Sequence, residues 1–303
     1  MTAALVLLCA MLLDAAFGEP DALWSRAPHP AVLMGRAVGR LEKKFNHGAY
    51  RRLKGCLCLT LLVVFGVLVG RLVSALGPVA ETLCVAVLLA HRSLVDHVSA
   101  VSIGLRRSLK DGRQAVAMIV SRDTEKMDQD QVVRAAIESG AENFSDGVVA
   151  PAFWFLVGGA PGIVVYKIVN TADSMIGYRT EKYEEFGWAA ARTDDLLNLI
   201  PARLSAALIV LSSARWSVSG LGADAKRHRS PNAGWPESAM ARALGISLSG
   251  PRAYDGKMHD YPWVNAAGRK DLSSPDIDAS VAMLWRAWGA TFTLCALVGF
   301  ILS

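Results

Sequence analysis

The chain has 303 residues, of which 52% are hydrophobic and only 19% are charged. Its mean hydropathy of +0.31 is too high for an ordinary soluble domain of this length, so the composition argues against that class and indicates an integral membrane protein. The formal net charge of +5 suits anionic lipid headgroups and anionic substrates equally, and it does not discriminate between them.

Six apolar segments follow one another along the chain. A membrane-spanning helix needs about 20 mostly apolar residues, and only the second and fourth segments are long enough without help. Strand-like alternation is scarce, so we predict an all-α integral membrane protein with four to six membrane-embedded helices, plus cytoplasmic helices and loops. The segments are Thr2–Leu13, Gly55–Leu76, Gly77–Ala90, Gly147–Tyr166, Leu196–Ala214 and Ala287–Ser303.

The first segment is predicted to be a retained helix. A secretory signal peptide begins with a positively charged region, and here no Lys or Arg precedes Arg26. Asp14 also stands where the apolar run of a signal peptide would continue.

The basic residues predict the orientation in the membrane. Residues 19–54 carry eight Lys or Arg, residues 91–147 eight, and residues 215–286 ten. By the positive-inside rule all three stretches should be cytoplasmic, with the Gly77-Pro78 turn on the opposite side. If the fourth and fifth segments both crossed the membrane, residues 167–195 would be separated from the polar motifs at 121–146.

The fourth and fifth segments contain helix-breaking residues. The sequence Gly-Gly-Ala-Pro-Gly occupies residues 158–162, and Pro201 and Arg203 lie in the fifth segment. Irregular backbone at membrane depth must line a cavity or be covered by protein. We therefore favour re-entrant or protein-buried helices over six plain spans.

We expect one membrane-embedded domain. Its parts are N-terminal helices (1–90), a motif-rich catalytic core (91–214), a cytoplasmic loop region (215–286) and a C-terminal helix (287–303). Apolar residues from Leu94 to Leu109 recur at steps of three and four, which predicts an amphipathic helix. Residues 131–142 predict another, capped by Asp128 or Asp130. The Gly- and Pro-rich stretch from Pro231 to Pro275 predicts a long loop or a small excursion.

The first polar constellation lies just before the fourth apolar segment. Glu142, Asn143 and Asp146 offer the hard oxygen ligands that magnesium takes when it also holds nucleotide phosphates. Arg134, Glu138 and Glu142 fall at steps of four, and for Glu138 alone we favour a solvated helix face held by Arg134–Glu138 pairing.

The second constellation follows the fourth apolar segment. Asn170 and Asp173 are three residues apart, so a helix would place them side by side, and Tyr178 and Arg179 could stack on and pair with an anionic substrate. A helix cap with turn chemistry would account for Asn170 but not for Asp173 and Arg179 together.

The third constellation precedes the fifth apolar segment. Asp194 and Asp195 lie four and three residues before Asn198, which makes a metal-facing surface geometrically simple. An arginine inside an apolar helix should be paired, and we expect Arg203 to pair with one of these acids. A purely structural salt bridge remains an alternative. Arg192 completes the group, and residues 122–124 form a similar but weaker one.

Known nucleotide and hydrolase motifs are absent from the sequence. There is no G-x-x-x-x-G-K-[ST] loop and no G-x-S-x-G elbow. By composition alone His29 is a loop residue. The motifs themselves therefore predict an acid-rich intramembrane or interfacial site that holds a metal and an anionic ligand.

Seven collinear motifs together resemble the adenosylcobinamide-phosphate synthase (CobD/CbiB) family of vitamin B12 biosynthesis. One short motif would be weak, but seven in order across nearly the whole chain are specific. The one departure is Arg242, where the family pattern leads us to expect a small residue. The motifs are HPAVLMGR (29–36), SRDT (121–124), AENFSDGVVAPAFW (141–154), YKIVNTADSMIGYR (166–179), FGWAAARTDDLLNLIPARL (186–204), NAGWPESAMARALG (232–245) and GPRAYDG (250–256).

The resemblance implies a multi-pass enzyme of the cell inner membrane with its motif-rich region in the cytoplasm. It would amidate adenosylcobyric acid with (R)-1-amino-2-propanol or its O-phosphate, giving adenosylcobinamide or its phosphate. ATP and Mg²⁺ are implied, and so are contacts with membrane lipid but not with nucleic acid. A homo-oligomer and a complex with other late cobalamin-assembly membrane enzymes both stay open.

Roles for the residues follow from this chemistry as hypotheses. Activation of a carboxylate as an acyl phosphate needs metal ligands for the nucleotide and cations for the developing charge. We assign catalysis to Asp173, Asp194, Asp195 and Arg203, substrate binding to Arg179, Arg192, Tyr178, Asn170 and His29, and metal binding to Glu142, Asn143, Asp146 and Asn198.

Two hypotheses from other functional classes are alternatives to an enzyme. A non-catalytic membrane regulator, of the sensor branch related to this family, would share the membrane layout but could relax the acidic cluster, which here is complete. A transporter would fit the broken fourth segment, yet no pair of similar half-segments is detectable.

Overall fold

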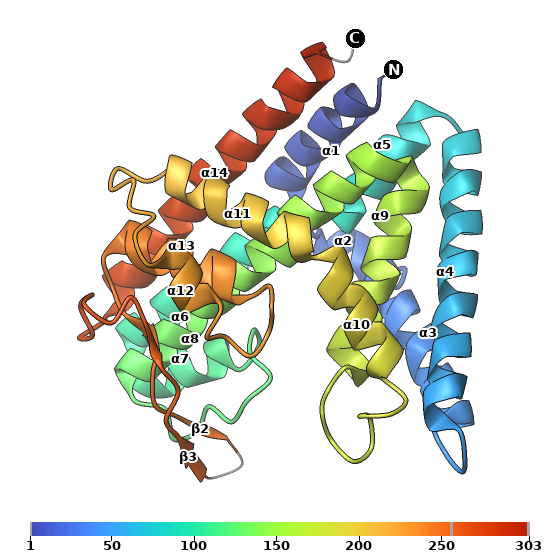
Figure 1. The fold of residues 1–303 in the computed structure, drawn as a ribbon. Helices are drawn as coiled ribbons and strands as arrows, with labels where there is room; N and C mark the ends of the chain where they lie inside the picture. Colours follow the sequence, from blue (N-terminus) through green and yellow to red (C-terminus); the bar gives the residue numbers. More distant parts are fainter. Residues whose placement is uncertain (1, 255–256, 302–303) are drawn as a thin grey trace. The chain divides into compact units, whose positions relative to one another are not determined.

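The computed structural model describes residues 2–254 and 257–301, and the chain divides into two compact units (Figure 1). Unit 1 is formed by residues 2–90, 150–199 and 294–301, and unit 2 by residues 91–149 and 200–293. Both units are built mainly from helices, which confirms the predicted all-α class.

Unit 1 is a group of helices around the long helix α9. Helices α3, α4, α5 and α10 all pack against α9, and α1 packs against α5 and α9. Its core includes Leu7 and Met11 of α1 and Ile163 and Tyr166 of α9, all almost fully buried. The helices are α1 (Ala3–Phe17), α2 (Asp21–Trp24), α3 (Pro30–Phe45), α4 (Arg51–Ala75), α5 (Pro78–Leu88), α9 (Ala150–Ile176) and α10 (Trp188–Leu197).

Helix α9 is broken at its centre, as the sequence predicts. Gly159 has φ 61° and ψ −154°, a conformation that glycine adopts far more readily than other residues. A Cβ at Gly162 would collide with the carbonyl oxygen of Trp154, although eight residues of continuous helix would separate the two positions by about 12 Å. The chain therefore turns back on itself at Gly159, and Figure 1 shows the two halves of α9 running in different directions.

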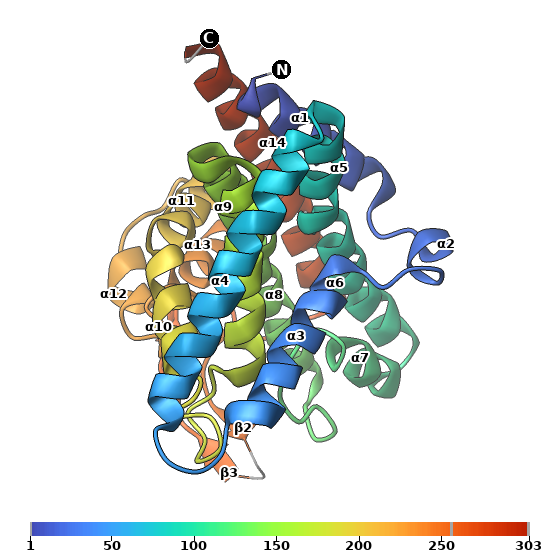
Figure 2. The same cartoon turned by 90° about the vertical axis from the view of Figure 1, so that its right-hand side faces the viewer.

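Helix α4 presents one face to the unit and the other outward (Figure 2). Leu59 and Leu62 are buried, whereas Leu57, Leu61 and Phe65 are each about 60% exposed (62%, 59% and 59%). An outward face of this kind suits contact with lipid.

Unit 2 has one apolar core shared by α6, α8, α11, α13 and α14. Val98, Ile137, Ile209, Met240 and Leu284 meet in it with essentially no exposed surface. The elements are α6 (His91–Arg107), α7 (Leu109–Val116), α8 (Gln129–Phe144), the π-helix η1 (Ser145–Val149), α11 (Leu199–Leu211), α12 (Leu221–Ala225), α13 (Gly234–Leu244), β1 (Leu248–Ser249), β2 (Arg252–Tyr254), β3 (Lys257–His259), β4 (Trp263–Val264) and α14 (Ser274–Ile301). Residues 294–301 of α14 belong to unit 1.

One helix ends earlier than predicted, and the cap of another is now decided between the two predicted residues. The amphipathic helix expected to reach Leu109 ends at Arg107, because Ser108 is extended and caps α7 through a hydrogen bond from the Asp111 N–H to its hydroxyl. Helix α8 is capped by Asp128 and not by Asp130, and Gln131 completes the capping box.

The stretch from Pro231 to Pro275 is more ordered than the predicted loop. It contains α13 and four short strands, in which β1 pairs with β4 and β2 with β3, both antiparallel. The C-terminal helix begins at Ser274, before the start expected from the apolar run alone, because its first turns are polar.

Four helical segments in the described part of the chain are long and apolar enough to cross a membrane. They are Arg51–Ala75, Pro78–Arg107, Gln129–Ile176 and Ser274–Ile301. The third contains the break at Gly159, so its length does not correspond to one straight span. Shorter apolar helices are Ala3–Phe17 and Leu199–Leu211.

Candidate functional site

Asp194 lies at the centre of a polar cluster buried in unit 1. The Nδ2 of Asn198 donates to Oδ2 of Asp194 over 3.0 Å, and the Nδ2 of Asn170 lies 3.3 Å from its Oδ1. The Tyr166 hydroxyl donates to Oδ1 of Asn198 over 3.0 Å. Residues 166 and 170 are one turn apart on α9, and 194 and 198 one turn apart at the end of α10. We call these four residues the Asp194 cluster.

The carboxyl of Asp194 is a weaker acid than an ordinary aspartate. Burial raises the pKa of its carboxyl to about 6, the hydrogen bonds from Asn170 and Asn198 oppose the rise, and the charge of Asp195 adds to it. The carboxyl therefore exchanges a proton close to neutral pH. Such a group can act as a general base or acid, which is common at functional sites.

Asp195 is the more exposed neighbour and is surrounded by cations. Its Oδ2 lies 3.4 Å from Nη1 of Arg192. Burial raises the pKa of Asp195, while the positive charges of Arg192 and Arg179 oppose that rise. Arg179 and Arg192 are both exposed, as is Tyr178. Two of the predicted substrate-binding residues, Arg179 and Arg192, thus lie close enough to Asp195 to affect the pKa of its carboxyl.

Asp173 and His29 have local structural roles in unit 1. Asp173 is half-buried and its carbonyl accepts the N–H of Gly177 at the end of α9. His29 caps α3 by accepting the Ala31 N–H at Nδ1 over 3.2 Å, and its ring meets Trp24 edge-on at 4.5 Å. The cap also explains why this histidine precedes a proline at the first position of a helix.

The predicted metal ligands of unit 2 lie where α8 passes into the π-helix. Glu142 and Asn143 are exposed and Asp146 is half-buried. The Nδ2 of Asn143 donates to the carbonyl and hydroxyl oxygens of Ser139, at 2.9 and 3.1 Å. These two hydrogen bonds turn the amide nitrogen of Asn143 toward helix α8. Three oxygen donors thus lie within two turns, and π-helical turns of this kind are frequent at functional sites.

The described side chains alone do not form a complete metal cage. Over residues 2–254 and 257–301, no three His, Cys, Asp or Glu side chains gather as metal ligands. Magnesium usually takes one or two carboxylates and completes its shell with water and substrate phosphates. The pair Glu142 and Asp146, with Asn143 between them, fits that type of site.

Arg203 differs from the expectation of an arginine buried in an apolar helix. It is exposed, its guanidinium lies 4.7 Å from the centre of the Trp235 ring, and its Nη1 donates to Oδ1 of Asn232 over 3.3 Å. The motif at 232–245 supplies both partners. Trp235 and Asn232 are therefore candidate site residues that the spacing argument did not single out.

The interpretation of Glu138 as part of a solvated face is wrong. Glu138 is 6% exposed and Arg134 is 8% exposed. The Oε1 of Glu138 accepts the Ser249 N–H over 2.6 Å, and its Oε2 lies 3.4 Å from Nη2 of Arg122. The steps of four from Arg134 to Glu142 were visible in the sequence, but burial of that face depends on strand β1, which the sequence pattern did not reveal.

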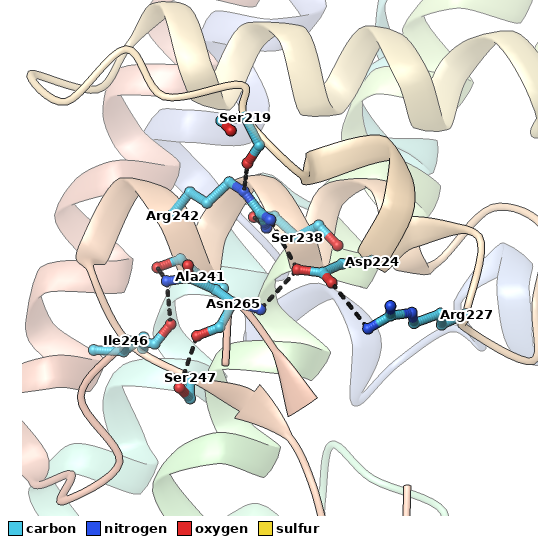
Figure 3. Close-up of polar contacts among 9 residues, drawn as sticks. All are labelled: Ser219, Asp224, Arg227, Ser238, Ala241, Arg242, Ile246, Ser247 and Asn265. Carbon is cyan, nitrogen blue, oxygen red and sulfur yellow. Dashed lines mark hydrogen bonds and ion pairs between the residues drawn. The ribbon is translucent and has the colours of Figure 1, made fainter. Parts of the chain in front are cut away.

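Arg242, the departure from the expected small residue, also has a structural partner. Its Nη2 donates to Oδ2 of Asp224 over 2.8 Å, and its Nε to the Ser219 carbonyl over 2.8 Å (Figure 3). The backbone N–H of Asn265 donates to the same Asp224 oxygen over 2.8 Å. We call Asp224, Arg242 and Asn265 the Asp224 clasp. It joins α12, α13 and the end of β4.

The predicted residues therefore fall into two groups. Four of them lie in unit 2, namely Glu142, Asn143, Asp146 and Arg203. Unit 1 contains the remaining nine, and there the structure brings Asn170, Asp194 and Asn198 into one hydrogen-bonded set, with Asp195, Arg192 and Arg179 linked by charge. Tyr166 was not predicted. It lies in an apolar run of the sequence, and only the hydrogen bond from its hydroxyl to Asn198 shows that it belongs to the Asp194 cluster.

Comparison with known proteins gives matches along nearly the whole chain. The family model described as CobD/Cbib protein matches residues 7–284. The cobalamin biosynthesis protein CobD of Sinorhizobium fredii is 48% identical over 302 residues, which cover 93% of each chain. The protein of the same name from Rhizobium meliloti is 48% identical over 313 residues (96% of each chain), and that from Rhodobacter capsulatus is 45% identical over 314 residues (100% and 99%). No solved structure matches.

Proposed function

Because the chain belongs to the CobD/CbiB protein family of cobalamin biosynthesis, we propose that it is the ATP-dependent amide ligase of that pathway. It joins adenosylcobyric acid to (R)-1-amino-2-propanol or its O-phosphate. Family membership supports a biosynthetic enzyme, and the chemistry of the Asp194 cluster carries the more specific assignment.

Amide formation requires an uncharged amine at the moment of attack. A protonated amine has no lone pair, so a group must accept its proton. Asp194 suits that role, because burial raises its pKa to about 6 and two carboxamides hold its oxygens in place. A carboxyl of this acidity is largely ionised at pH 7 and yet basic enough to receive the proton. Asn170 and Asn198 are positioning residues in this proposal.

The exposed arginines suit the anionic groups of the reaction. Arg179 and Arg192 lie close enough to Asp195 to oppose the rise in its pKa. Their guanidinium groups would neutralise a substrate carboxylate or phosphate, for which the planar donor fork is well matched. Arg203, stacked on Trp235, offers a third such group in unit 2. Asp173 is assigned to orienting the amine.

Glu142, Asn143 and Asp146 would hold Mg²⁺ in this proposal. When bound, Mg-ATP would supply the phosphoryl group that activates the carboxylate and the cation that neutralises its charge. The exposure of Glu142 and Asn143 leaves both side chains open to a ligand. We further propose that the protein lies in the inner membrane with these motifs on the cytoplasmic side, where ATP is available.

The direct test uses the full chain purified in detergent or nanodiscs. It is incubated with adenosylcobyric acid, ATP, Mg²⁺ and either 1-amino-2-propanol or its O-phosphate, and the corrinoid product is followed by chromatography and mass. An ATP-dependent amide is expected. Asp194→Asn and Asp146→Asn should each lower the rate by about a hundredfold or more.

The matched control is Asp96→Asn, an exposed acid of α6 that pairs with Arg92 one turn away. It should keep wild-type turnover. If no combination of substrates gives the amide with wild-type protein, the ligase assignment is rejected and a regulatory role becomes the better explanation. Unchanged turnover in both site variants would remove Asp194 and Asp146 from the machinery.

A further inference from the structure

Arg122 pairs with the buried carboxylate of Glu138 in unit 2, and Arg134 and Lys270 lie over the ring of Trp263. The side chain of Arg122 is 9% exposed, and its Nη2 lies 3.4 Å from Oε2 of Glu138. The guanidinium of Arg134 lies 5.2 Å from the centre of the Trp263 ring, and the Nζ of Lys270 lies 4.6 Å from it. Arg134 and Lys270 thus share the Trp263 ring. The Glu138–Arg122 pair reaches the same two strands, because Glu138 binds the N–H of Ser249, the partner of Trp263 in the β1–β4 pairing.

We propose that these cations form a binding site for a phosphoryl group of a substrate. The site rests on the proposed ligase function and assigns to that reaction a phosphate subsite, formed by Arg122, Arg134 and Lys270. The phosphoryl group could come from the nucleotide or from the O-phosphate of the amine. Both present the same tetrahedral oxygens to the protein.

The strongest single observation is the Nε of Arg122. This atom is buried and has no hydrogen-bond partner among the described residues. A buried donor without an acceptor costs about 1–3 kcal/mol, so it should meet an acceptor in the functional state. The Nη2 of the same group is already fixed by Glu138. Glu138 therefore holds the guanidinium in place while its Nε remains available to an oxygen.

The charges favour an anion over any other ligand. The side chains of Arg122 and Arg134 are both largely buried, and the buried Nε of Arg122 is a donor on a cation, which an anionic oxygen satisfies best. Burial lowers the effective dielectric, so a guanidinium there attracts a phosphate more strongly than a surface lysine would. Guanidinium groups bind phosphate oxygens through paired N–H donors. Lys270 is exposed and would lie at the entrance.

The backbone around the site is held by the Asp224 clasp. Asn265 bonds to Asp224 (Figure 3). It directly follows strand β4, which carries Trp263. Strand β1 pairs with β4 and carries Ser249, whose N–H is bound by Glu138. Ser249 has φ 60°, a strained conformation for serine. Strain kept by such a network is typical of a binding site.

The site continues toward the proposed magnesium ligands along one helix. Arg134, Glu138 and Glu142 follow at steps of four on α8, and each step advances about 6 Å along the axis. Arg134 and Glu142 are therefore about 12 Å apart along the axis of the same helix.

The test measures ligand binding by the full chain in nanodiscs, without turnover. The probes are a β,γ-imido analogue of ATP with Mg²⁺, 1-amino-2-propanol O-phosphate, and the unphosphorylated amine. Arg122→Gln should weaken at least one phosphate-bearing probe by about tenfold or more. Lys270→Gln should weaken the same probe by about threefold. Arg107→Gln, an exposed arginine of α6, should leave each affinity within about twofold.

The outcomes separate the two phosphate sources. If only the nucleotide analogue loses affinity, the subsite belongs to ATP. If only the amine phosphate loses affinity, the subsite belongs to that substrate. Arg122→Lys, which keeps the charge, should recover part of the affinity. If Arg122→Gln does not fold, Lys270→Gln decides, because its side chain is exposed.

The proposal is overturned if neither phosphate-bearing probe binds wild-type protein, or if the variants bind both probes as tightly as wild type. A weakened unphosphorylated amine in both variants would also overturn it, since that probe carries no phosphoryl group. Amide formation is measured in parallel. Active variants with unchanged phosphate binding would reject the subsite and keep the ligase, whereas altered binding without any amide product would keep the subsite and reject the ligase.

Discussion

Asn198 donates a hydrogen bond to the carboxylate of Asp194, its neighbour one turn earlier, and both side chains are buried. The same asparagine accepts the hydroxyl of Tyr166. The carboxamide is therefore fixed at both ends, and its orientation toward Asp194 is set by the fold of unit 1. Asp194 is held in a defined position before any substrate arrives.

The acidity of Asp194 predicts a pH dependence of stability. Its pKa is about 6 in the folded chain, against 3.8 for an ordinary aspartate carboxyl, so the folded state binds the proton more tightly. The free energy of unfolding should fall as pH rises from about 4 to 6, by on the order of 3 kcal/mol, and then level off. Asp194→Asn should flatten this dependence. Thermal melts in detergent between those pH values would measure it, and equal slopes for both proteins would contradict the prediction.

The reversal in α9 predicts different effects for two neighbouring glycines. In Gly162→Ala the new Cβ would collide with the Trp154 carbonyl oxygen, whereas a Cβ at Gly158 would meet nothing within 4 Å. Gly162→Ala should therefore destabilise the protein by about 1–3 kcal/mol. Gly158→Ala should be neutral or slightly stabilising. Unfolding midpoints of the two variants provide the measurement, and equal midpoints would argue against the reversal.

The Asp224 clasp predicts that Arg242 contributes more to the stability of the protein than Arg227, which lies beside the same carboxylate. The Arg242 side chain is 8% exposed and lies 2.8 Å from Asp224, whereas Arg227 is 64% exposed and 3.9 Å away. Arg242→Met should destabilise the protein by about 3–5 kcal/mol, because it leaves a largely buried carboxylate with only the exposed and more distant Arg227 as a cation. Arg227→Met should cost less than about 1 kcal/mol. A clasp without energetic importance would give two equal, small changes.

The membrane topology predicts the location of the loop between α9 and α10. A reporter fused after Glu181 should read as cytoplasmic, together with one fused after Lys126. Residues 91–147 and 215–286 carry eight and ten Lys or Arg, which favours the cytoplasm for both, and re-entrant segments keep the stretch between them on the same side. A reporter after Gly77 should read as periplasmic. A periplasmic signal after Glu181 would refute the re-entrant topology and restore six plain spans.

Much of the fold followed from local sequence signals. The cap at Asp128 and the break at residues 158–162 were both predictable, because a capping side chain and a Gly-Pro interruption act over a few residues. The early end of α6 at Arg107 was missed. The apolar periodicity continues through Leu109, but Ser108 prefers to cap the next helix.

In the candidate site, too, local relationships could be predicted from the sequence and long-range contacts could not. Asp194 and Asn198 are one turn apart, so spacing alone predicted that they share one helix face, and the hydrogen bond between them came from the structure. Tyr166 and Ser249 join their clusters through contacts over 32 and 111 residues, and no local pattern encodes such pairs. Arg122 was ranked as part of a weaker group for the same reason, because the carboxylate that holds it belongs to another element and its burial depends on the packing of unit 2.

The turn at Gly159 also has an electrostatic consequence. At the tip of a helical hairpin, the carbonyl end of the first half meets the amide end of the second. Each helix end carries a partial charge of about half an elementary charge, negative at the carbonyl end and positive at the amide end. These two opposite partial charges largely cancel at residues 158–162, a stretch without a polar side chain. The tip is therefore nearly neutral, and it can be buried in an apolar environment without a counter-ion.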